Sequence, residues 1–374
     1  MAGIYIHIPF CKQACNYCNF HFSTSLQMKD AIIDSIVQEI EIRASYLQNQ
    51  SIETIYLGGG TPSILDISDL QKIWNAIQLH FPNIDLQEFT LEANPDDLKE
   101  SFIKDLRSIP VNRLSIGVQS FFDRDLQYMN RAHNATEADY SIKLAQDLGF
   151  DNMSIDLIYG TPGLTNEDWK ENIHKAQALS INHISSYALT VEPKTALDYQ
   201  ILKGKTVAPS DDQAAAQFEI LMQEMQSGGY DHYEISNFAL PGKYALHNTN
   251  YWKGIHYLGL GPSAHSFNGY SRQWNKAHNI QYINALKDGN TFSEIEILST
   301  EDQMNELIMT SLRTMWGLDL TLVIERFGIE SQLQILNQSQ DFIQQGYMVK
   351  KDEQLILTSQ GKLLADGIAA ELFF

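Results

Sequence analysis

Three cysteines, Cys11, Cys15 and Cys18, have the most specific spacing in this 374-residue chain, which contains no other cysteine. The pattern C-x3-C-x2-C places three thiolates on one short segment, and thiolates are the usual ligands of iron–sulfur clusters. With three cysteines, a [4Fe–4S] cluster keeps one iron open to a ligand that is not cysteine. A zinc site with His7 or His21 as the fourth ligand is the alternative. An odd number of cysteines this close together does not suit a secreted disulfide framework.

The residue types between the cysteines help to distinguish an iron–sulfur cluster from a zinc site. With Tyr17 before the third cysteine, the pattern becomes C-x3-C-x-aromatic-C and resembles the signature of radical S-adenosylmethionine (SAM) proteins. The resemblance implies a [4Fe–4S] cluster whose open iron is chelated by SAM. In such proteins the cofactor supplies the radical chemistry, and the protein binds and orients it.

A glycine-rich segment, Leu57-Gly-Gly-Gly-Thr-Pro62, follows the second predicted strand. It lacks the Gly-Lys-Ser/Thr ending of a phosphate-binding P-loop. Without the cysteines it would be only a turn between a strand and a helix, since glycine permits close approach of the backbone. With them, it resembles the loop of radical SAM proteins that contacts SAM, which implies that Gly59, Gly60 and Thr61 lie at the SAM site.

Polar residues at the ends of predicted strands extend the same resemblance, because ligands of parallel βα folds bind at the carboxyl ends of strands. Asp156 stands out, because a carboxylate within an apolar strand needs a partner. Six residues match SAM-contacting positions of the coproporphyrinogen-dehydrogenase branch of radical SAM proteins: Tyr5, Glu92, Gln119, Arg131, Asp156 and Ala188. The resemblance implies that Asp156 binds the ribose hydroxyls, that Arg131 pairs with the SAM carboxylate, and that Ala188 lies near the adenine.

The string His247-Asn-Thr-Asn-Tyr-Trp252 could bind a porphyrin, because imidazole is a common axial ligand of haem iron and aromatic rings offer flat faces. Taken alone, the string favours a different interpretation, a loop whose His247 caps backbone groups and whose aromatic residues belong to the core. It resembles the H-N-x-x-Y-W motif of HemW-type haem chaperones. That resemblance implies a haem site formed by His247, Asn248, Tyr251 and Trp252, with His247 as the candidate iron ligand. His256 and His265 lie nearby in sequence and compete for this role.

Two relatives within the branch must be separated: HemW-type chaperones and oxygen-independent coproporphyrinogen III oxidase. The oxidase has a further cysteine two residues after the third, where this chain has Phe20. It also has an N-terminal extension, for which the chain leaves no room before Cys11. Both differences and the H-N-x-x-Y-W motif favour a haem chaperone without coproporphyrinogen dehydrogenase activity. The alternatives are a radical SAM enzyme acting on coproporphyrinogen or another tetrapyrrole, and a zinc-stabilised binding module.

Strands and helices alternate through the first half of the chain, which is typical of βα units with a parallel sheet. Six strands are predicted at 4–8, 54–57, 88–92, 113–119, 152–158 and 183–191. Helices are predicted near 26–48, 66–80, 97–107, 136–148, 166–179 and 211–227. The pattern alone fits a barrel of fewer than eight units or an open doubly wound sheet. The resemblance favours an α/β fold, a partial TIM-type barrel of about six βα units.

The pattern divides the chain into three parts: a βα core over 1–228, an irregular segment over 229–290, and a mainly helical domain over 291–374. Helices near 302–316 and 330–345, then a hairpin around Lys351-Asp-Glu353, suggest a winged-helix-like module. This module holds 5 Lys/Arg and 13 Asp/Glu, net 5 − 13 = −8. A docking or lid role is therefore favoured over DNA binding.

The whole chain is acidic, with 26 Lys plus Arg against 46 Asp plus Glu and a net charge of −20. Nucleic acids are poor partners for such a surface, although one pocket can still be basic. No signal peptide and no apolar run long enough to span a membrane are evident, which indicates a cytoplasmic protein. The resemblance implies haem as cargo and recipient haem proteins, with respiratory membrane enzymes as candidates. Transient contact with the membrane surface and a homodimer are compatible with this prediction.

Overall fold

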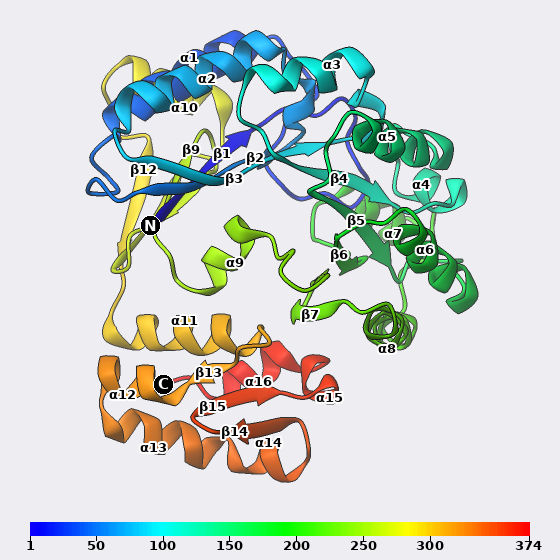
Figure 1. The fold of residues 1–374 in the computed structure, drawn as a ribbon, viewed down its shortest axis with the longest axis vertical. Helices are drawn as coiled ribbons and strands as arrows, with labels where there is room; N and C mark the ends of the chain where they lie inside the picture. Colours follow the sequence, from blue (N-terminus) through cyan, green and yellow to red (C-terminus); the bar gives the residue numbers. More distant parts are fainter.

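A curved sheet of twelve strands organises most of the chain in the computed structural model, which describes residues 1–374 (Figure 1). The strand order is β12-β11-β10-β9-β1-β2-β3-β4-β5-β6-β8-β7. The seven neighbouring strands from β9 through β1 to β6 are parallel. Antiparallel strands extend both ends, and the two end strands, β12 and β7, do not pair with each other, so the barrel is partial.

The parallel strands are β1 (Ala2–Ile8), β2 (Ile52–Gly59), β3 (Ile84–Ala93), β4 (Arg113–Gln119), β5 (Met153–Tyr159), β6 (His183–Ala188) and β9 (Tyr257–Leu260). The antiparallel strands are β7 (Asp231–Glu234), β8 (Asn237–Ala239), β10 (His265–Phe267), β11 (Ser271–Asn275) and β12 (Ser293–Ile297). The helices are α1 (Lys29–Ile42), α2 (Ile67–His80), α3 (Glu100–Asp105), α4 (Asp123–Tyr128), α5 (Ala135–Asp147), α6 (Asn166–Ala178), α7 (Ala196–Leu202), α8 (Asp211–Ser227), α9 (Leu246–Trp252) and α10 (Asn279–Lys287).

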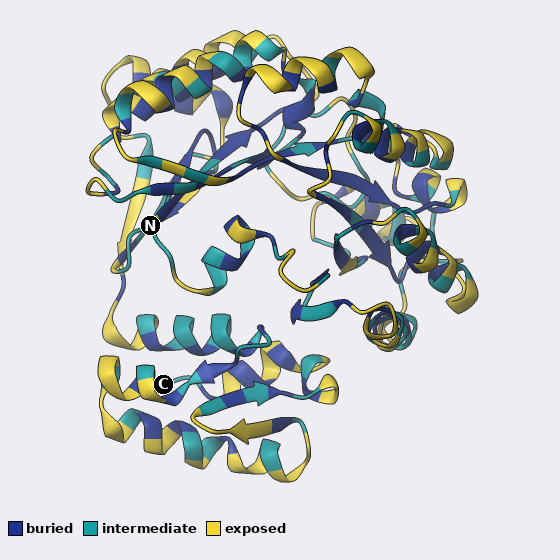
Figure 2. Cartoon of the chain, viewed as in Figure 1, coloured by how far each residue is buried: buried dark blue, intermediate teal, exposed yellow.

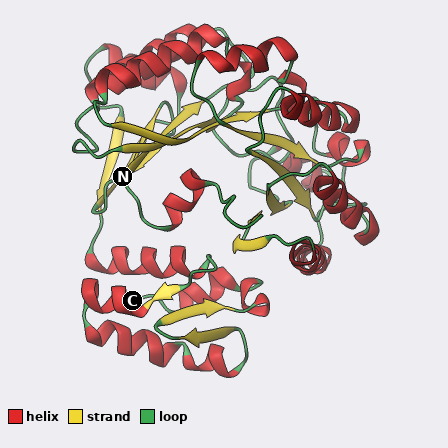
Figure 3. Ribbon diagram, in the orientation of Figure 1, coloured by secondary structure: helices red, strands yellow, loops and turns green.

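The crossover helices cover only the outer, convex face of the sheet (Figure 3). The partial barrel is therefore confirmed, and the doubly wound alternative, which needs helices on both faces, is wrong. The six predicted strands and the helices between them are present, with ends that differ by a few residues. The largest difference is α1, predicted over 26–48 but ending at Ile42.

Side chains along the parallel strands alternate between an apolar face that packs in the core and an inner face that carries polar groups. In β1, Ile4, Ile6 and Ile8 are fully buried in the main core, while Tyr5 lines a cavity on the inner side. In β5, Ile155 and Leu157 belong to the core and Asp156 faces the inner side. Figure 2 shows the strands as the most buried part of the molecule and the outer helix faces as exposed. The inner face is thus where polar side chains collect.

Residues 229–290 are not irregular, contrary to the prediction. They form five strands and two helices, and β9 pairs with β1 as a parallel strand. The strands are only 3–5 residues long, too short for a periodic pattern to show in the sequence. The Gly259-Leu-Gly261 string lies at the end of β9, and the Gly261 N–H donates to the buried Glu39 carboxylate.

The C-terminal part has a hydrophobic core of its own. Its elements are α11 (Thr300–Leu312), β13 (Leu318–Asp319), α12 (Leu320–Phe327), α13 (Ile329–Gln338), α14 (Gln340–Gln344), β14 (Met348–Lys351), β15 (Gln354–Leu357), α15 (Ser359–Lys362) and α16 (Ala365–Glu371). The predicted hairpin is confirmed as β14 and β15, and the α12 helix was not predicted. The predicted start at residue 291 falls one strand early, because β12 pairs with β11 in the main sheet. No helix is long and apolar enough to cross a lipid bilayer.

A buried carboxylate joins the first helix to the last part of the sheet. Glu39 of α1 is fully buried and accepts hydrogen bonds from the Tyr282 hydroxyl (2.6 Å), the Gly261 N–H (2.8 Å) and the Asn275 amide (2.8 Å). The Arg43 guanidinium lies 3.4 Å from the same carboxylate. These partners come from three different elements of residues 229–290, so one side chain holds that segment against α1.

We expect Glu39→Ala to lower the free energy of unfolding by about 3–5 kcal/mol, because it leaves Arg43 buried without its carboxylate and three donors without an acceptor. Chemical denaturation followed by circular dichroism measures the change. Glu41→Ala is the matched control, since Glu41 is exposed on the same helix. Equal stability of the two variants would contradict the role given to Glu39.

Candidate functional site

The cysteine segment follows β1 and is held in place by the turn between α4 and α5. The Asn16 N–H donates to the Met129 carbonyl (3.0 Å), and its side-chain amide donates to the Tyr128 carbonyl (2.8 Å). The Asn130 amide donates to the Ala14 carbonyl (2.7 Å). Tyr17 packs against a small apolar cluster. The segment therefore has a defined conformation although it contains no regular element.

All three cysteines line one cavity of about 430 Å³ at the carboxyl ends of the parallel strands. Eight of the nine predicted SAM residues line the same cavity: Gly59, Gly60, Thr61, Glu92, Gln119, Arg131, Asp156 and Ala188. Tyr5, the ninth, lines an adjoining cavity that shares Glu92 and Asp156 with the first. The fold thus brings together residues that are spread over more than 180 positions of the chain.

The glycine loop packs directly against the start of the cysteine segment. The Gly60 N–H donates to the Ile8 carbonyl (2.8 Å) and the Thr61 N–H donates to the Phe10 carbonyl (2.7 Å). A Cβ atom on Gly60 would lie 2.5 Å from the Phe10 carbonyl oxygen, a distance that permits only glycine. The glycine loop therefore lines the cavity and also fixes the position of the backbone just before Cys11.

Arg131 connects the cysteines to the strand ends. Its guanidinium donates to Cys15 Sγ (3.2 Å), to the Asn94 side-chain oxygen (2.7 Å) and to the Gly117 carbonyl (2.7 Å). The Nε–H group is buried and has no acceptor. A guanidinium with an unpaired donor at the cavity wall can receive a carboxylate.

Two half-buried carboxylates, Glu92 on β3 and Asp156 on β5, line the cavity from the strands on either side of β4. Glu92 accepts hydrogen bonds from the Tyr56 hydroxyl (2.7 Å) and the Gly59 N–H (3.2 Å). Burial raises the pKa of Glu92 to about 7 and the pKa of Asp156 to about 6. Near neutral pH the Asp156 carboxylate accepts hydrogen bonds, while the Glu92 carboxyl is partly protonated and can also donate one, which suits hydroxyl groups such as those of a ribose.

The four predicted haem residues lie on or beside α9, but they face two different spaces. His247 and Asn248 line the inner cavity of about 230 Å³ under the sheet, and Trp252 lines a larger groove toward the C-terminal part. Tyr251 borders both spaces. His247 is 2% exposed, and its ring nitrogens lie 2.8 Å from the Thr54 hydroxyl and 2.8 Å from the Tyr251 hydroxyl. Burial lowers the pKa of His247 to about 3, so the ring is neutral.

The sequence matches agree with this geometry. Residues 5–176 match the model of the radical SAM superfamily, and residues 298–364 match the HemN C-terminal domain. The chain is 35% identical to the heme chaperone HemW of Bacillus subtilis, with 98% of each chain covered. It is 30% identical to the heme chaperone HemW of Escherichia coli, covering 99% of this chain and 97% of that protein. The chain belongs to the HemW family of radical SAM proteins.

A solved structure shows the same fold for a member of the wider superfamily. Coproporphyrinogen III oxidase (HemN) from Escherichia coli aligns with a TM-score of 0.85 at 23% identity, covering 100% of this chain and 90% of that one. At this identity the likeness establishes the architecture, including the helical part after the sheet. It leaves the chemistry to the residues themselves.

Membership in the radical SAM superfamily implies a [4Fe–4S] cluster and SAM as cofactors. The cavity fits both groups, because three thiolates and the unpaired Arg131 donor face one space. No three His, Cys, Asp or Glu side chains converge on a point where a single ion would bind. A cluster does not need such convergence, since each thiolate binds a different iron.

The two histidines considered as the fourth ligand of a zinc site, His7 and His21, both form other contacts. His7 Nε2 lies 2.9 Å from the His21 carbonyl oxygen, and His7 Nδ1 lies 3.1 Å from the Tyr5 hydroxyl. His21 Nε2 lies 2.7 Å from the Asn279 side-chain oxygen. Neither histidine lines the cysteine cavity. Phe20, the residue that replaces the oxidase cysteine, lines this cavity and is 69% exposed.

Several residues of the site were not predicted from the sequence. Asn94 orients Arg131, and Tyr56 donates to Glu92. Arg113 is a buried cation in the inner cavity, 3.8 Å from the Glu88 carboxylate. Alternation could have found Tyr56 and Arg113, because both occupy inner-face positions of predicted strands. Asn94 had a weaker signal, its position just after a strand end.

The raised pKa of Glu92 predicts a pH-dependent stability. From pH 4.5, the ordinary value of a glutamate, to about 7, the folded state holds the Glu92 proton more tightly than the unfolded state. Stability present below pH 4.5 is therefore lost as the pH rises through about 7, by at most about 3 kcal/mol. We expect a smaller fall in melting temperature between pH 5 and pH 8 in Glu92→Gln than in the unaltered protein, both measured without SAM. Asp85→Asn, an exposed position on β3, should leave the fall unchanged.

Proposed function

We propose that the chain is a haem chaperone, which binds haem and delivers it to haem proteins and carries a [4Fe–4S] cluster and SAM. The observation that carries this proposal is the full-length similarity to heme chaperone HemW proteins at 30–35% identity. Phe20 supports it, because this exposed residue offers no thiolate where the oxidase has its further cysteine.

Each cofactor has its own set of residues in this proposal. Cys11, Cys15 and Cys18 bind three irons of the cluster, and SAM occupies the fourth. Arg131 pairs with the SAM carboxylate, Asp156 and Glu92 bind polar groups of SAM, and Ala188 leaves space for the adenine. When bound, the reduced cluster supplies an electron to SAM. In a chaperone the cluster acts structurally or in electron transfer rather than in radical chemistry on a substrate.

The haem site is built around α9 in this proposal. Tyr251 and Trp252 offer aromatic surface at the groove, and His247 and Asn248 anchor the helix from the side of the inner cavity. His247 is the candidate iron ligand from the sequence motif. Its two ring nitrogens are engaged with Thr54 and Tyr251, so ligation by His247 requires that both contacts change.

A radical SAM enzyme acting on coproporphyrinogen is the second candidate function. The observation that favours it is the complete SAM cavity, which continues into an inner cavity through Glu92, Ser115, Asp156 and Tyr187. An enzyme needs such a connection between cofactor and substrate. Coproporphyrinogen turnover therefore distinguishes the two functions.

Recipients and assembly complete the proposal. Respiratory membrane enzymes are candidate recipients, which brings the chaperone to the membrane surface transiently from the cytoplasm. The edge strand β12 supports a homodimer, since it pairs with β11 on one side and with no strand on the other. Its Ile295 and Ile297 side chains are 61% and 68% exposed.

The protein reconstituted anaerobically should bind haem stoichiometrically and convert no coproporphyrinogen III in the presence of SAM and a reductant. Each of Cys11→Ser, Cys15→Ser and Cys18→Ser should lower the iron and sulfide content and abolish the cluster absorbance, because each removes one thiolate. The measurements are haem titration by absorbance, iron and sulfide analysis, and porphyrin chromatography.

Phe20→Ser is the control for the cysteine variants, since it changes the cavity rim without removing a thiolate. Sustained coproporphyrinogen turnover with only loose haem binding would replace the chaperone by the enzyme. A colourless protein with one zinc per chain would instead support the zinc-stabilised module.

A further inference from the structure

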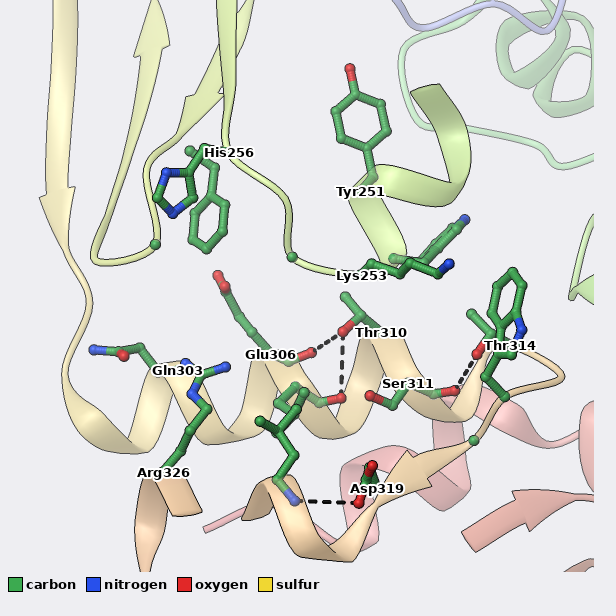
Figure 4. Close-up of a pocket in the computed structure, with 18 of the residues that line it drawn as sticks. Tyr251, Lys253, His256, Gln303, Glu306, Thr310, Ser311, Thr314, Asp319 and Arg326 are labelled. Atoms are coloured by element: carbon green, nitrogen blue, oxygen red, sulfur yellow. Dashed lines mark hydrogen bonds between the residues drawn. The ribbon is translucent and has the colours of Figure 1, made fainter. Parts of the chain in front are cut away.

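A groove of about 890 Å³ lies between the strands β9–β11 with α9 on one side and the C-terminal part on the other. Figure 4 shows Tyr251, Lys253 and His256 on the first side, opposite Glu306, Thr310 and Ser311 of α11. The volume lies within the range of small-molecule sites, about 300–1,000 Å³. The inner cavity beside His247 measures about 230 Å³, too small for a tetrapyrrole without rearrangement.

His256 offers a ring nitrogen to this groove. Its Nδ1 lies 2.7 Å from the side-chain amide of Gln50, while its Nε2 has no partner within the protein. Gly269 stands beside Nε2, and a Cβ atom there would come within 2.7 Å of it. The glycine therefore keeps the space at this nitrogen open. Burial lowers the pKa of His256, which favours the neutral ring that binds metal.

The Gln50 contact suits a metal-binding histidine. An amide presents either its oxygen or its nitrogen to the ring, and the two ends are interchangeable by a flip. With the oxygen toward Nδ1–H, the tautomer is fixed and the lone pair lies on Nε2. Such a partner behind a ligating histidine is the usual arrangement in metal sites.

The groove walls provide flat aromatic surface. On the first side, the rings of Tyr257 and Phe267 lie next to each other, with centroids 6.4 Å apart. Trp252 and Trp316 also line the groove, and the Trp316 ring lies under the Lys253 ammonium group. On the opposite side, the Thr310 and Thr314 hydroxyls donate to carbonyl oxygens near them in the chain, at 2.8 Å and 2.9 Å. These contacts make the α11 wall less polar than its residue types suggest.

The groove also holds cations that no carboxylate neutralises. Lys253 lies over the Trp316 ring, 4.6 Å from its centre, and forms no ion pair. Arg326 likewise contacts only an aromatic ring, at 5.0 Å. The acids nearby are engaged elsewhere, because Glu306 pairs with Arg272 and Asp319 accepts from the first N–H groups of α12. Free cations beside an apolar surface suit a flat ligand with carboxylates.

From these observations we propose that haem binds in the groove between α9 and α11, with Nε2 of His256 as the protein ligand of its iron. Lys253 and Arg326 receive the propionates, and the aromatic residues contact the ring. This inference rests on the proposed function, since it names the site where a chaperone would hold its cargo. It replaces His247 as iron ligand and makes His247 a positioning residue for α9.

Ferric haem is titrated into the holoprotein, and the Soret band and the electron paramagnetic resonance spectrum report the axial ligand. His256→Ala should lose the histidine-ligated spectrum and bind haem about tenfold more weakly, and added imidazole should restore the spectrum by entering the vacated space. The exposed His265→Ala should keep the ligated spectrum. Cluster absorbance and melting temperature confirm that each variant is folded.

Every outcome of this experiment bears on the assignment. If His256→Ala keeps the histidine-ligated spectrum, His256 is not the iron ligand. A loss of that spectrum that added imidazole does not restore also overturns the assignment, because it indicates a structural defect rather than a missing ligand. Should His256→Ala not fold, His256→Gln takes its place with the same readings. If the unaltered protein binds no haem, the proposed function itself fails. If it binds haem and His256→Ala is unaffected, only the site is wrong.

The propionate contacts have a separate test. Lys253→Gln combined with Arg326→Gln should weaken haem binding about tenfold, because two charge-assisted contacts are lost. Binding of haem dimethyl ester, which has no free carboxylates, should be the same in this double variant and in the unaltered protein. If the double variant binds haem and haem dimethyl ester more weakly to the same extent, Lys253 and Arg326 do not contact the propionates. Lys287→Gln, a lysine on α10 outside the groove, is the matched control.

Discussion

One buried carboxylate, that of Glu88 on β3, sets the position of α9 and with it both spaces in which ligands can bind. It accepts hydrogen bonds from the Leu246 and His247 N–H groups at 2.8 Å and 3.0 Å, at the start of the helix, where N–H groups lack partners within the helix. Arg113 stands behind it on β4. Because α9 separates the inner cavity from the groove, a shift of this contact would change both volumes together. The His247 ring adds a second contact between the start of α9 and the sheet, through the Thr54 hydroxyl on β2.

The parallel sheet makes this arrangement necessary. Its helices cover the convex face, so the polar side chains on the concave face must find partners within the concavity or in a bound molecule. At the cysteine end, Arg131 keeps an unpaired Nε–H and the Glu92 and Asp156 carboxyls hold raised pKa values, which indicates a surface prepared for a polar ligand. At the opposite end, α9 and the C-terminal part close the space. The fold therefore separates the cysteine cavity from the groove by the inner cavity, and Tyr251 lies at the boundary between the inner cavity and the groove.

The sequence predicts the first half of this structure well, because strand periodicity and the cysteine, glycine and strand-end motifs are local signals. The parallel strands β1–β6 follow from them, as does the gathering of the cysteines and most of the predicted SAM residues around one cavity. Residues 229–290 were misjudged because β7–β11 are short and are held by distant residues, such as Glu39 with Gly261 and Glu88 with His247. No local pattern reveals such contacts. The motif H-N-x-x-Y-W also suggested one site, whereas helical geometry turns His247 and Trp252 toward different spaces.

The overall charge illustrates why a site must be judged from its own residues. A chain with a net charge of −20 repels anions on average, and its C-terminal part is itself acidic. Yet charges act mainly within about 8–10 Å in physiological salt, so the local pairing of each group decides what a pocket attracts. In the groove, Glu306 is neutralised by Arg272 and Asp319 is used at a helix start, while Lys253 and Arg326 remain unpaired. An acidic surface around a pocket with free cations admits a dianionic ring and disfavours nucleic acid, whose many phosphates would meet the surrounding negative charge.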